Sequence, residues 1–472
     1  MGTAVRSPLG PRTVKMPWGL SLFLLAIFAF AVPFNPSNSG NLLEVGLDEA
    51  SQANEKKSEQ RQIALLCLGL FAALALSSKK RSRLRVSGLL GWSVLFFLFL
   101  ALASPAWAED SSLAIRRVGI LVLLCLGALA VAARLSQIQT AALAVCVCSF
   151  TLIVSLAVEL ASGTFRPLDG SWRFAGVVHP VTQGWNCGLL AIASLAMAAV
   201  SPRRRNRFIV LAAVAVLFLV LTRTRMALAS TILASAVCAS LVSPKARRLT
   251  LVSAYLLLCG SLVWVFRGGD LGGTTISIST LGRGEEAASS LSTLTGRVTL
   301  WNALLDYERA RPILGYGYNT FLTPRNLAAV SEGAGWVPAS AHSGYIGTLL
   351  ELGCLGAAAF VLVLALSLKR SLSLARYGPS AAFSAAVMIW LCCNLFLESG
   401  LIRDPAFTTF ISMVILASLA FKENVSHASG RLVTSRRLLT RIRLPLRLPQ
   451  PRGPIRLAIV QHVACKTNQH QE

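Results

Sequence analysis

The segment TRTRMALAS, residues 222–230, places two arginines at the junction of two apolar runs, with no acidic residue nearby in sequence. A charged side chain near membrane depth is costly unless something compensates it, so it often marks a ligand site or an ion path. A guanidinium group also matches phosphate oxygens through paired hydrogen bonds. Arg223 and Arg225 are therefore candidates for binding a phosphorylated substrate. The alternative is that each simply extends from a helix end to the membrane surface.

Another arginine opens the segment GRVTLWNALLDYERARPILGYGYNTF, residues 296–321. The pattern predicts a helix from Arg297 to about Arg311, stopped by Pro312 and a GYG turn. Arg297 and Trp301 stand four residues apart and share one face of this helix. We interpret the pair as part of a binding site that the turn directs back toward the membrane, with an ordinary surface helix as the alternative.

The segment AHSGYIGTLLELGCLG, residues 341–356, begins with His342 where a polar stretch meets an apolar run, and Tyr345 and Glu351 follow. A histidine with a pKa near 6.5 can accept a proton at neutral pH, which suits a general base. A lone histidine at such a boundary is more often just solvated, but here it stands among arginine motifs. We predict that His342 is a catalytic base, oriented by Glu351 or by a backbone carbonyl.

A further polar group precedes the apolar run that begins near residue 182. In RFAGVVHPVTQGWNCGLL, residues 173–190, Arg173 and His179 stand at the entrance of the predicted helix. Both are candidates for substrate binding, and helix capping is the equally simple alternative.

The elements that position these residues are apolar helices. The chain is 54% hydrophobic and 14% charged, with a mean hydropathy of +0.63, whereas soluble domains carry about 25% charged residues. Continuous apolar runs of membrane-crossing length predict an all-α, polytopic transmembrane helical bundle of about 12 helices. The predicted spans are 17–34, 61–78, 86–104, 117–134, 141–162, 182–200, 208–221, 226–243, 249–266, 343–367, 379–398 and 405–421.

Charge predicts the orientation of this bundle. The net charge of +25 does not indicate nucleic-acid binding, because the basic clusters all fall between spans on one side, whereas most acidic residues fall on the other. This is the positive-inside pattern. It predicts cytoplasmic termini and places the candidate site on the outer, periplasm-like face. The clusters are Lys79, Lys80, Arg81, Arg83 and Arg85; Arg203, Arg204, Arg205 and Arg207; Lys245, Arg247 and Arg248; and Lys369, Arg370 and Arg376.

The resulting organisation has four parts. Residues 1–266 hold nine spans with short loops and one polar outer loop at 35–60, and residues 267–342 form a long outer loop containing short helices. Residues 343–421 hold three more spans, and residues 422–472 form a basic cytoplasmic tail that suits contact with anionic lipid headgroups. The eleven cysteines show no disulfide or zinc spacing, and no nucleotide or metal motif is present. The pattern thus predicts chemistry without a metal or another cofactor.

The order of these motifs resembles the O-antigen ligase/O-antigen polymerase superfamily of bacterial inner membranes. That family carries a basic SR motif at a helix junction, then a long periplasmic loop with GR…W…P…GxGxxxF, then a histidine followed by ExGxxG at the start of the next helix. The segments 104–117 and 179–184 are similar to the exopolysaccharide-polymerisation branch. The matching residues are Thr224, Arg225, Gly296, Arg297, Trp301, Pro312, Gly315, Gly317, Phe321, His342, Tyr345, Glu351, Gly353 and Gly356.

The resemblance implies a metal-independent glycosyltransferase of the GT-C type. Its donor would be a glycan on undecaprenyl pyrophosphate, and its acceptor a sugar hydroxyl on lipid A–core or on a second lipid-linked glycan. Arg225 and Arg297 would stabilise the departing pyrophosphate, and His342 would take the proton from the attacking hydroxyl. A transporter or flippase of an anionic lipid-linked glycan is the competing interpretation. The absence of a repeat between the two halves of the chain argues against it.

Overall fold

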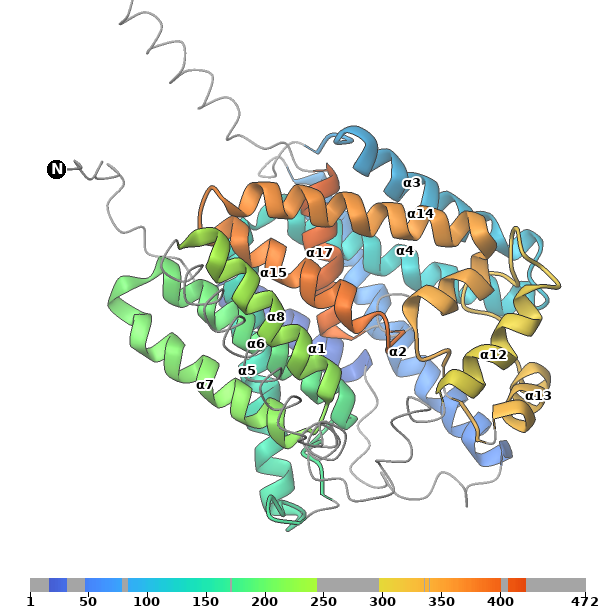
Figure 1. The fold of residues 1–472 in the computed structure, drawn as a ribbon, viewed down its shortest axis with the longest axis horizontal. Coiled ribbons are helices and arrows are strands. Elements are labelled where there is room, and N and C mark those ends of the chain that lie inside the picture. Colours follow the sequence, from blue (N-terminus) through green and yellow to red (C-terminus); the bar gives the residue numbers. More distant parts are fainter. Residues whose placement is uncertain are drawn as a thin grey trace, which may run out of the picture. The chain divides into compact units, whose positions relative to one another are not determined.

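We describe a computed structural model of the chain, over residues 17–31, 47–78, 84–169, 172–243, 297–334, 336–338, 340–399 and 406–421. The regular structure of these residues is helical (Figure 1). It consists of α1 (Trp18–Ala31), α2 (Leu47–Ser77), α3 (Gly88–Ala103), η1 (Ser104–Ala106), α4 (Ser111–Arg134), α5 (Gln137–Ala161), α6 (Pro180–Val200), η2 (Pro202–Arg204), α7 (Arg205–Leu221), α8 (Arg225–Val242), α12 (Arg297–Glu308), α13 (Pro324–Ala334), α14 (Gly344–Ala375), α15 (Pro379–Asn394) and α17 (Phe407–Phe421).

Each predicted span that falls on described residues coincides with a helix, and the span 249–266 lies outside them. Six helical segments in the described part are long and apolar enough to cross a membrane. The twelve-span topology stays a prediction. These six are Gly88–Ala106, Ser111–Arg134, Gln137–Ala161, Pro180–Val200, Arg225–Val242 and Gly344–Ala375, and shorter apolar helices cover Trp18–Phe28, Gln62–Ser77, Pro379–Asn394 and Phe407–Phe421.

The predicted polar loop at 35–60 is wrong in its second half, because α2 already begins at Leu47. Residues 47–60 are rich in Ala, Glu, Gln and Lys, which are strong helix formers, so the helix extends ahead of its apolar part. Residues 32–46 lie outside the described part. The helix α4 also begins earlier than predicted, because Asp110 caps it by accepting a hydrogen bond from the Leu113 amide at 2.8 Å.

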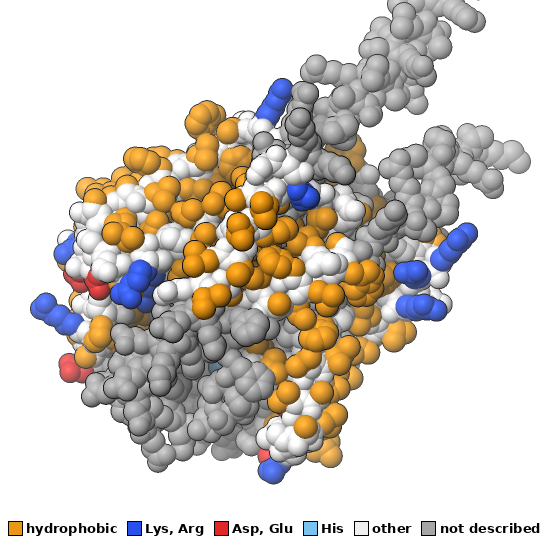
Figure 2. Space-filling model, turned by 180° about the vertical axis from the view of Figure 1, so that it is seen from behind, with side chains coloured by type: hydrophobic (Ala, Val, Ile, Leu, Met, Phe, Trp, Pro, Cys, Tyr) orange, Lys and Arg blue, Asp and Glu red, His pale blue; other side chains and the backbone are white. Residues whose placement is uncertain are grey.

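The core of the bundle lies around α6, which packs against α5, α7, α8 and α15. Within it the rings of Trp185 and Trp390 meet edge to face at 5.3 Å. Large apolar side chains on the outer surfaces of the helices are exposed, among them Leu70, Phe99 and Ile153. Figure 2 shows hydrophobic side chains over much of one face, with Lys and Arg side chains mainly near its margins. Such a surface suits contact with lipid.

The ends of the helices fall into two groups. At one end the Arg85 amide donates to the Phe421 carbonyl at 2.8 Å, and the Arg370 side chain donates to the Ser87 hydroxyl. The short connection Val200–Arg205, which carries the arginine cluster, also lies at this end. It joins the last turn of α6 to the first turn of α7, and the two helices run in opposite directions. The other end is formed by η1, the last turns of α5, α7 and α15, and the first turns of α6, α8 and α14. We call it the site end.

A break in α14 anchors the long loop at the site end. At Gly353 the backbone adopts φ 64° and ψ −169°, so the helical hydrogen bonds are interrupted there. The Tyr316 amide donates to the Leu350 carbonyl at 3.1 Å, and the Cys354 amide donates to the Pro312 carbonyl at 2.8 Å. The chain segment 312–317 thereby satisfies the backbone groups that the break exposes.

The same loop also docks against the junction of α3 and α4. The Trp107 indole donates to the Leu314 carbonyl at 2.9 Å, and the Ser104 hydroxyl accepts the Tyr318 amide at 2.9 Å. Burial raises the pKa of the Tyr318 phenol well above its ordinary value, and the nearby Glu351 carboxylate raises it further. Tyr318 is therefore a neutral, packed side chain. These contacts fix the place where α12 and α13 lie beside each other (Figure 1).

Candidate functional site

Arg297 lies at the first position of α12, and its guanidinium forms an ion pair with Glu398, which follows α15. The Nη2–Oε1 distance is 3.1 Å, and both side chains are 18% exposed. The pair connects the long loop to the membrane helices. Glu398 lies 101 residues further along the chain, so the sequence neighbours of Arg297 do not indicate this partner.

His342 is positioned from both sides by backbone contacts. On one side the Trp301 indole donates to the Ala341 carbonyl at 2.9 Å. On the other, the Gly344 amide donates to the carbonyls of Leu395 at 2.8 Å and Glu398 at 3.1 Å. Arg297 and Trp301, which were predicted to share one face of a helix, therefore lie beside His342.

The backbone of His342 is left-handed, with φ 48°. A residue other than glycine adopts this conformation only when its surroundings impose it, and such strain is concentrated at functional sites. The ring lies 5.4 Å from that of Trp336. The half-buried His342 is thus held in one place between the loop and the start of α14.

A second group of cationic side chains lies where α7 gives way to α8. The Arg173 Nε donates to the Thr222 carbonyl at 3.1 Å, and the Arg223 Nη2 donates to the Asp169 carbonyl at 3.0 Å. Arg225 is the first residue of α8 and is half-buried. Arg223 has a left-handed backbone, with φ 52°. The structure therefore brings Arg173 next to the 222–225 junction, which the sequence alone did not relate to it.

The first turn of α8 has no side-chain cap. The Thr224 hydroxyl contacts the Pro180 carbonyl at 3.3 Å and the Thr222 hydroxyl at 3.1 Å, and it does not cap the helix. The amides of a helix N-terminus that lack a side-chain cap, together with the helix dipole, favour negative charge. Arg225 stands at this position.

The two groups lie at the same end of the bundle. The Asn394 amide of α15 donates to the Ser230 hydroxyl of α8 at 2.7 Å, in the buried interior. Arg225 comes five residues before Ser230, or about 7–8 Å along the helix toward the site end. Glu398 and the contacts that hold His342 lie beyond Asn394 in the same direction. The fold thus places Arg225, Arg297 and His342 at one end, although no two of them share an element.

Three other predicted binding residues have structural partners. The exposed His179 accepts the Val181 amide on Nδ1 at 3.3 Å and caps α6, which is the alternative role given for it above. The Tyr345 hydroxyl donates to the Cys392 carbonyl at 3.1 Å. Glu351 accepts the Asn319 amide at 2.8 Å, which gives its side chain a partner in the long loop.

Residues that sequence reasoning missed hold the loops in place. Glu398 is one. Another is the buried Glu159 of α5, whose Oε1 accepts the amides of Ala175 and Gly176 at 2.8 and 2.7 Å and so fixes the loop that carries Arg173. A third is Arg117, which donates to the Asn319 side chain at 3.0 Å. Glu159 could have been found from the sequence, because it is a lone carboxylate within an apolar run.

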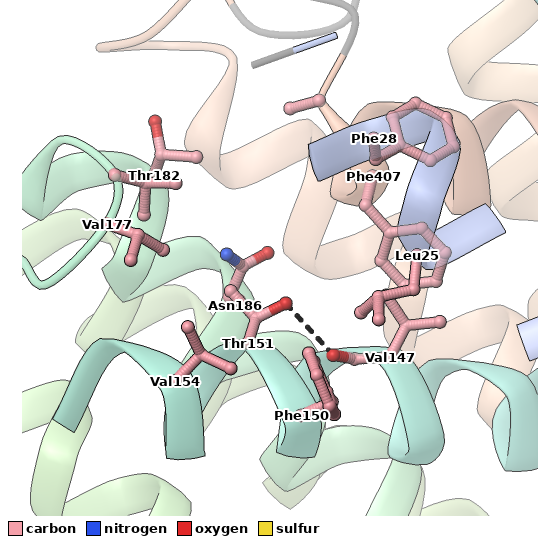
Figure 3. A pocket seen from close by; sticks show the side chains of 12 residues that line it. Leu25, Phe28, Val147, Phe150, Thr151, Val154, Val177, Thr182, Asn186 and Phe407 are labelled. Atoms are coloured by element: carbon pink, nitrogen blue, oxygen red, sulfur yellow. Dashed lines mark hydrogen bonds between the residues drawn. The ribbon is translucent and has the colours of Figure 1, made fainter. Parts of the chain in front are cut away.

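An apolar cavity of about 170 Å³ opens near the site end, between α1, α5, α6 and α17. Figure 3 shows Phe28, Phe150 and Phe407 along its wall. Its polar groups are the amide of Asn186 and the hydroxyls of Thr182 and Thr151, of which Thr151 donates to the Val147 carbonyl at 3.0 Å. Its lining suits a hydrocarbon chain more than a sugar. Elsewhere in the described residues, no group of three or more His, Cys, Asp or Glu side chains is placed to hold a metal ion.

Taken together, these features define a helical membrane protein with a cationic and histidine-bearing site at one end of its bundle. Residues 210–361 match the O-antigen ligase family. Over this segment the match confirms the resemblance to the O-antigen ligase/O-antigen polymerase superfamily that the motifs indicated. The matched segment includes Arg225, Arg297 and His342 but ends before Glu398. No curated protein matches the chain.

Proposed function

We propose that the protein is a bacterial inner-membrane transferase that moves a glycan from undecaprenyl pyrophosphate to a sugar hydroxyl. The acceptor is lipid A–core if the enzyme is a ligase, and a second lipid-linked glycan if it is a polymerase. The observation that carries the proposal is the grouping of Arg225, Arg297 and His342 at one end of an apolar bundle, within the segment that matches the O-antigen ligase family.

In the proposed reaction the anomeric carbon–oxygen bond to the pyrophosphate breaks, and a bond forms from the acceptor oxygen to the same carbon. The pyrophosphate gains negative charge as its bond breaks. Preorganised cations and helix amides aimed at that charge lower the barrier most where water is scarce. Arg225 with the uncapped first turn of α8 supplies one such group, and Arg297 supplies the second from the long loop.

The acceptor hydroxyl must lose its proton as it attacks. His342 is the proposed base because it lies between the Arg297 helix and α14, and because a neutral imidazole accepts a proton near pH 7. The contacts at Ala341 and Gly344 restrict its position from both sides. That restriction suits a base that must meet the acceptor in one orientation.

The apolar cavity near α6 suits the polyprenyl part of the donor. Its aromatic side chains come from α1, α5 and α17, and the side-chain amide of Asn186 also lines the cavity. The membrane orientation follows from charge. The arginine cluster around η2 lies at the end opposite the site and is cytoplasmic by the positive-inside rule, so the site faces the periplasm.

Purified protein in detergent, with a polyprenyl-pyrophosphate glycan and an acceptor glycan, tests the proposal. A transferase forms the joined product without any vesicle, whereas a carrier forms none. Arg225→Ala should lose the activity, and Arg309→Ala is the matched control, because Arg309 pairs with Asp306 on the exposed surface of α12. Absence of product from the wild-type protein, together with movement of the donor across vesicles, would refute the proposal in favour of a carrier.

A further inference from the structure

Glu398 lies outside every motif that the sequence singled out, yet it contacts both halves of the candidate site. Its carboxylate pairs with Arg297 at 3.1 Å, and its backbone carbonyl accepts the Gly344 amide at 3.1 Å. Gly344 is the first residue of α14, two positions after His342. One residue therefore connects the arginine of the long loop to the turn that carries the histidine.

We propose that Glu398 is a positioning residue for the transfer reaction, which orients the Arg297 guanidinium toward the pyrophosphate of the donor. This inference rests on the proposed function. A guanidinium carries five N–H donors in a planar fork, and Glu398 is bound through Nη2, so donors remain for a second anion. An arginine side chain has many rotamers, and a fixed carboxylate partner restricts them before the substrate arrives.

The burial of the pair supports a role beyond surface charge. At 18% exposure each side chain is largely withdrawn from solvent, whereas the Arg309–Asp306 pair on the same helix is 77% and 68% exposed. Withdrawn charges are screened less and hold their geometry better. The two pairs on α12 therefore form a natural comparison, in which one lies at the site and the other does not.

The proposal predicts changes in kcat and KM that a purely structural ion pair would not produce. Without the carboxylate, Arg297 loses its orientation but also loses a competitor for the pyrophosphate. The turnover number, kcat, should then fall while the KM for the donor stays constant or decreases. A loss of transition-state orientation without a loss of ground-state binding has this form.

The experiment compares Glu398→Gln, Glu398→Asp and the control Asp306→Asn for kcat, donor KM and thermal unfolding in detergent. Glu398→Gln should lower kcat by about 10-fold or more without raising the donor KM. Glu398→Asp keeps the charge one methylene further away and should retain an intermediate rate. Asp306→Asn should match the wild type. A wild-type rate in Glu398→Gln, or a fall in kcat with a matching rise in donor KM, would overturn the inference.

A charge-reversed double variant separates positioning from simple attachment. In Arg297→Glu with Glu398→Arg the ion pair can re-form, so the melting temperature should return toward that of the wild type. The guanidinium would then project from the turn after α15 instead of from α12, and activity should stay low. Recovery of both stability and activity would show that the pair only attaches the loop, and would refute the inference. A wild type that transfers nothing refutes the proposed function itself, which is a distinguishable result.

Discussion

Gly353→Ala should destabilise the protein strongly, because the break in α14 depends on a backbone conformation open only to glycine. With φ 64° and ψ −169°, Gly353 lies in a region that other residues essentially do not occupy, at a cost of about 1–3 kcal/mol. An added Cβ would also stand 2.2 Å from the Ile313 carbonyl oxygen and 2.6 Å from the Leu314 amide nitrogen. Both atoms are backbone, so the loop would have to move away.

That movement would break the hydrogen bonds between segment 312–317 and α14. The bonds to the carbonyls of Leu350, Glu351 and Pro312 are 3.1, 2.8 and 2.8 Å long. Each contributes about 0.5–1.5 kcal/mol net. Together with the backbone strain, the expected loss is about 3–7 kcal/mol. The loop that carries Arg297 would lose its anchor at the same time, so transfer activity should fall as well.

Thermal unfolding in detergent measures this loss, with Gly119→Ala as the matched control. Gly119 lies in α4 with nothing within 4 Å of its added Cβ, so alanine there should leave stability unchanged or raise it by up to about 1 kcal/mol. Limited proteolysis of residues 309–322 provides a second readout, because an undocked loop is cleaved faster. Equal melting temperatures and equal cleavage rates for wild type and Gly353→Ala would refute the account of the break.

The remaining predictions concern the site. Arg225→Ala and Arg297→Ala should each lower turnover by about 10²-fold or more. Lysine at either position should restore little activity, because it lacks the planar fork of donors. Near-normal turnover in Arg225→Ala would mean that Arg225 only extends to the membrane surface. Activity should survive EDTA, and a loss that Mg²⁺ or Mn²⁺ restores would contradict stabilisation by arginine alone. Reporter fusions at residue 330 should report the periplasm and those at residue 205 the cytoplasm, and a cytoplasmic signal at 330 would exclude the proposed face. Since a base acts when neutral, activity should rise with pH as His342 loses its proton. His342→Ala should lose about 10²- to 10⁴-fold with little change in donor affinity; a substantial remaining rate would make His342 a binding or structural group.

The helices were predictable because a long apolar run is itself the signal of a membrane-crossing helix. Their exact ends were less predictable, because they depend on capping residues. The predicted spans located both ends of α8 and the start of α14 to within one residue, whereas α14 continues to Ala375, beyond its predicted end at 367. The sequence did not reveal that α2 extends back to Leu47, because polar helix formers carry no hydrophobic signal. It predicted short helices in the long loop but did not place α13, whose eleven residues from Pro324 mix apolar and polar side chains and pack against α12.

The contacts of the site were less predictable, because they join residues far apart in the chain. Arg297 and Glu398 are 101 residues apart, and Arg173 and Thr222 are 49 apart. No local pattern encodes such pairs. What the sequence did carry was residue type at helix ends. This was enough to nominate Arg225, Arg297 and His342 as candidates, but not to identify Glu398 as the partner of Arg297.

Glu351 and Glu398 differ in the groups that their side chains bind. Glu351 belongs to the motif, and its side chain accepts the Asn319 amide, so it stabilises the turn that docks on α14. Glu398 belongs to no motif, and its side chain accepts from Arg297. Substituting Glu351 should therefore act mainly through loop stability, with a lower melting temperature accompanying any loss of rate. Substituting Glu398 should act on rate beyond its effect on stability, because the group it orients is charged and faces the proposed substrate.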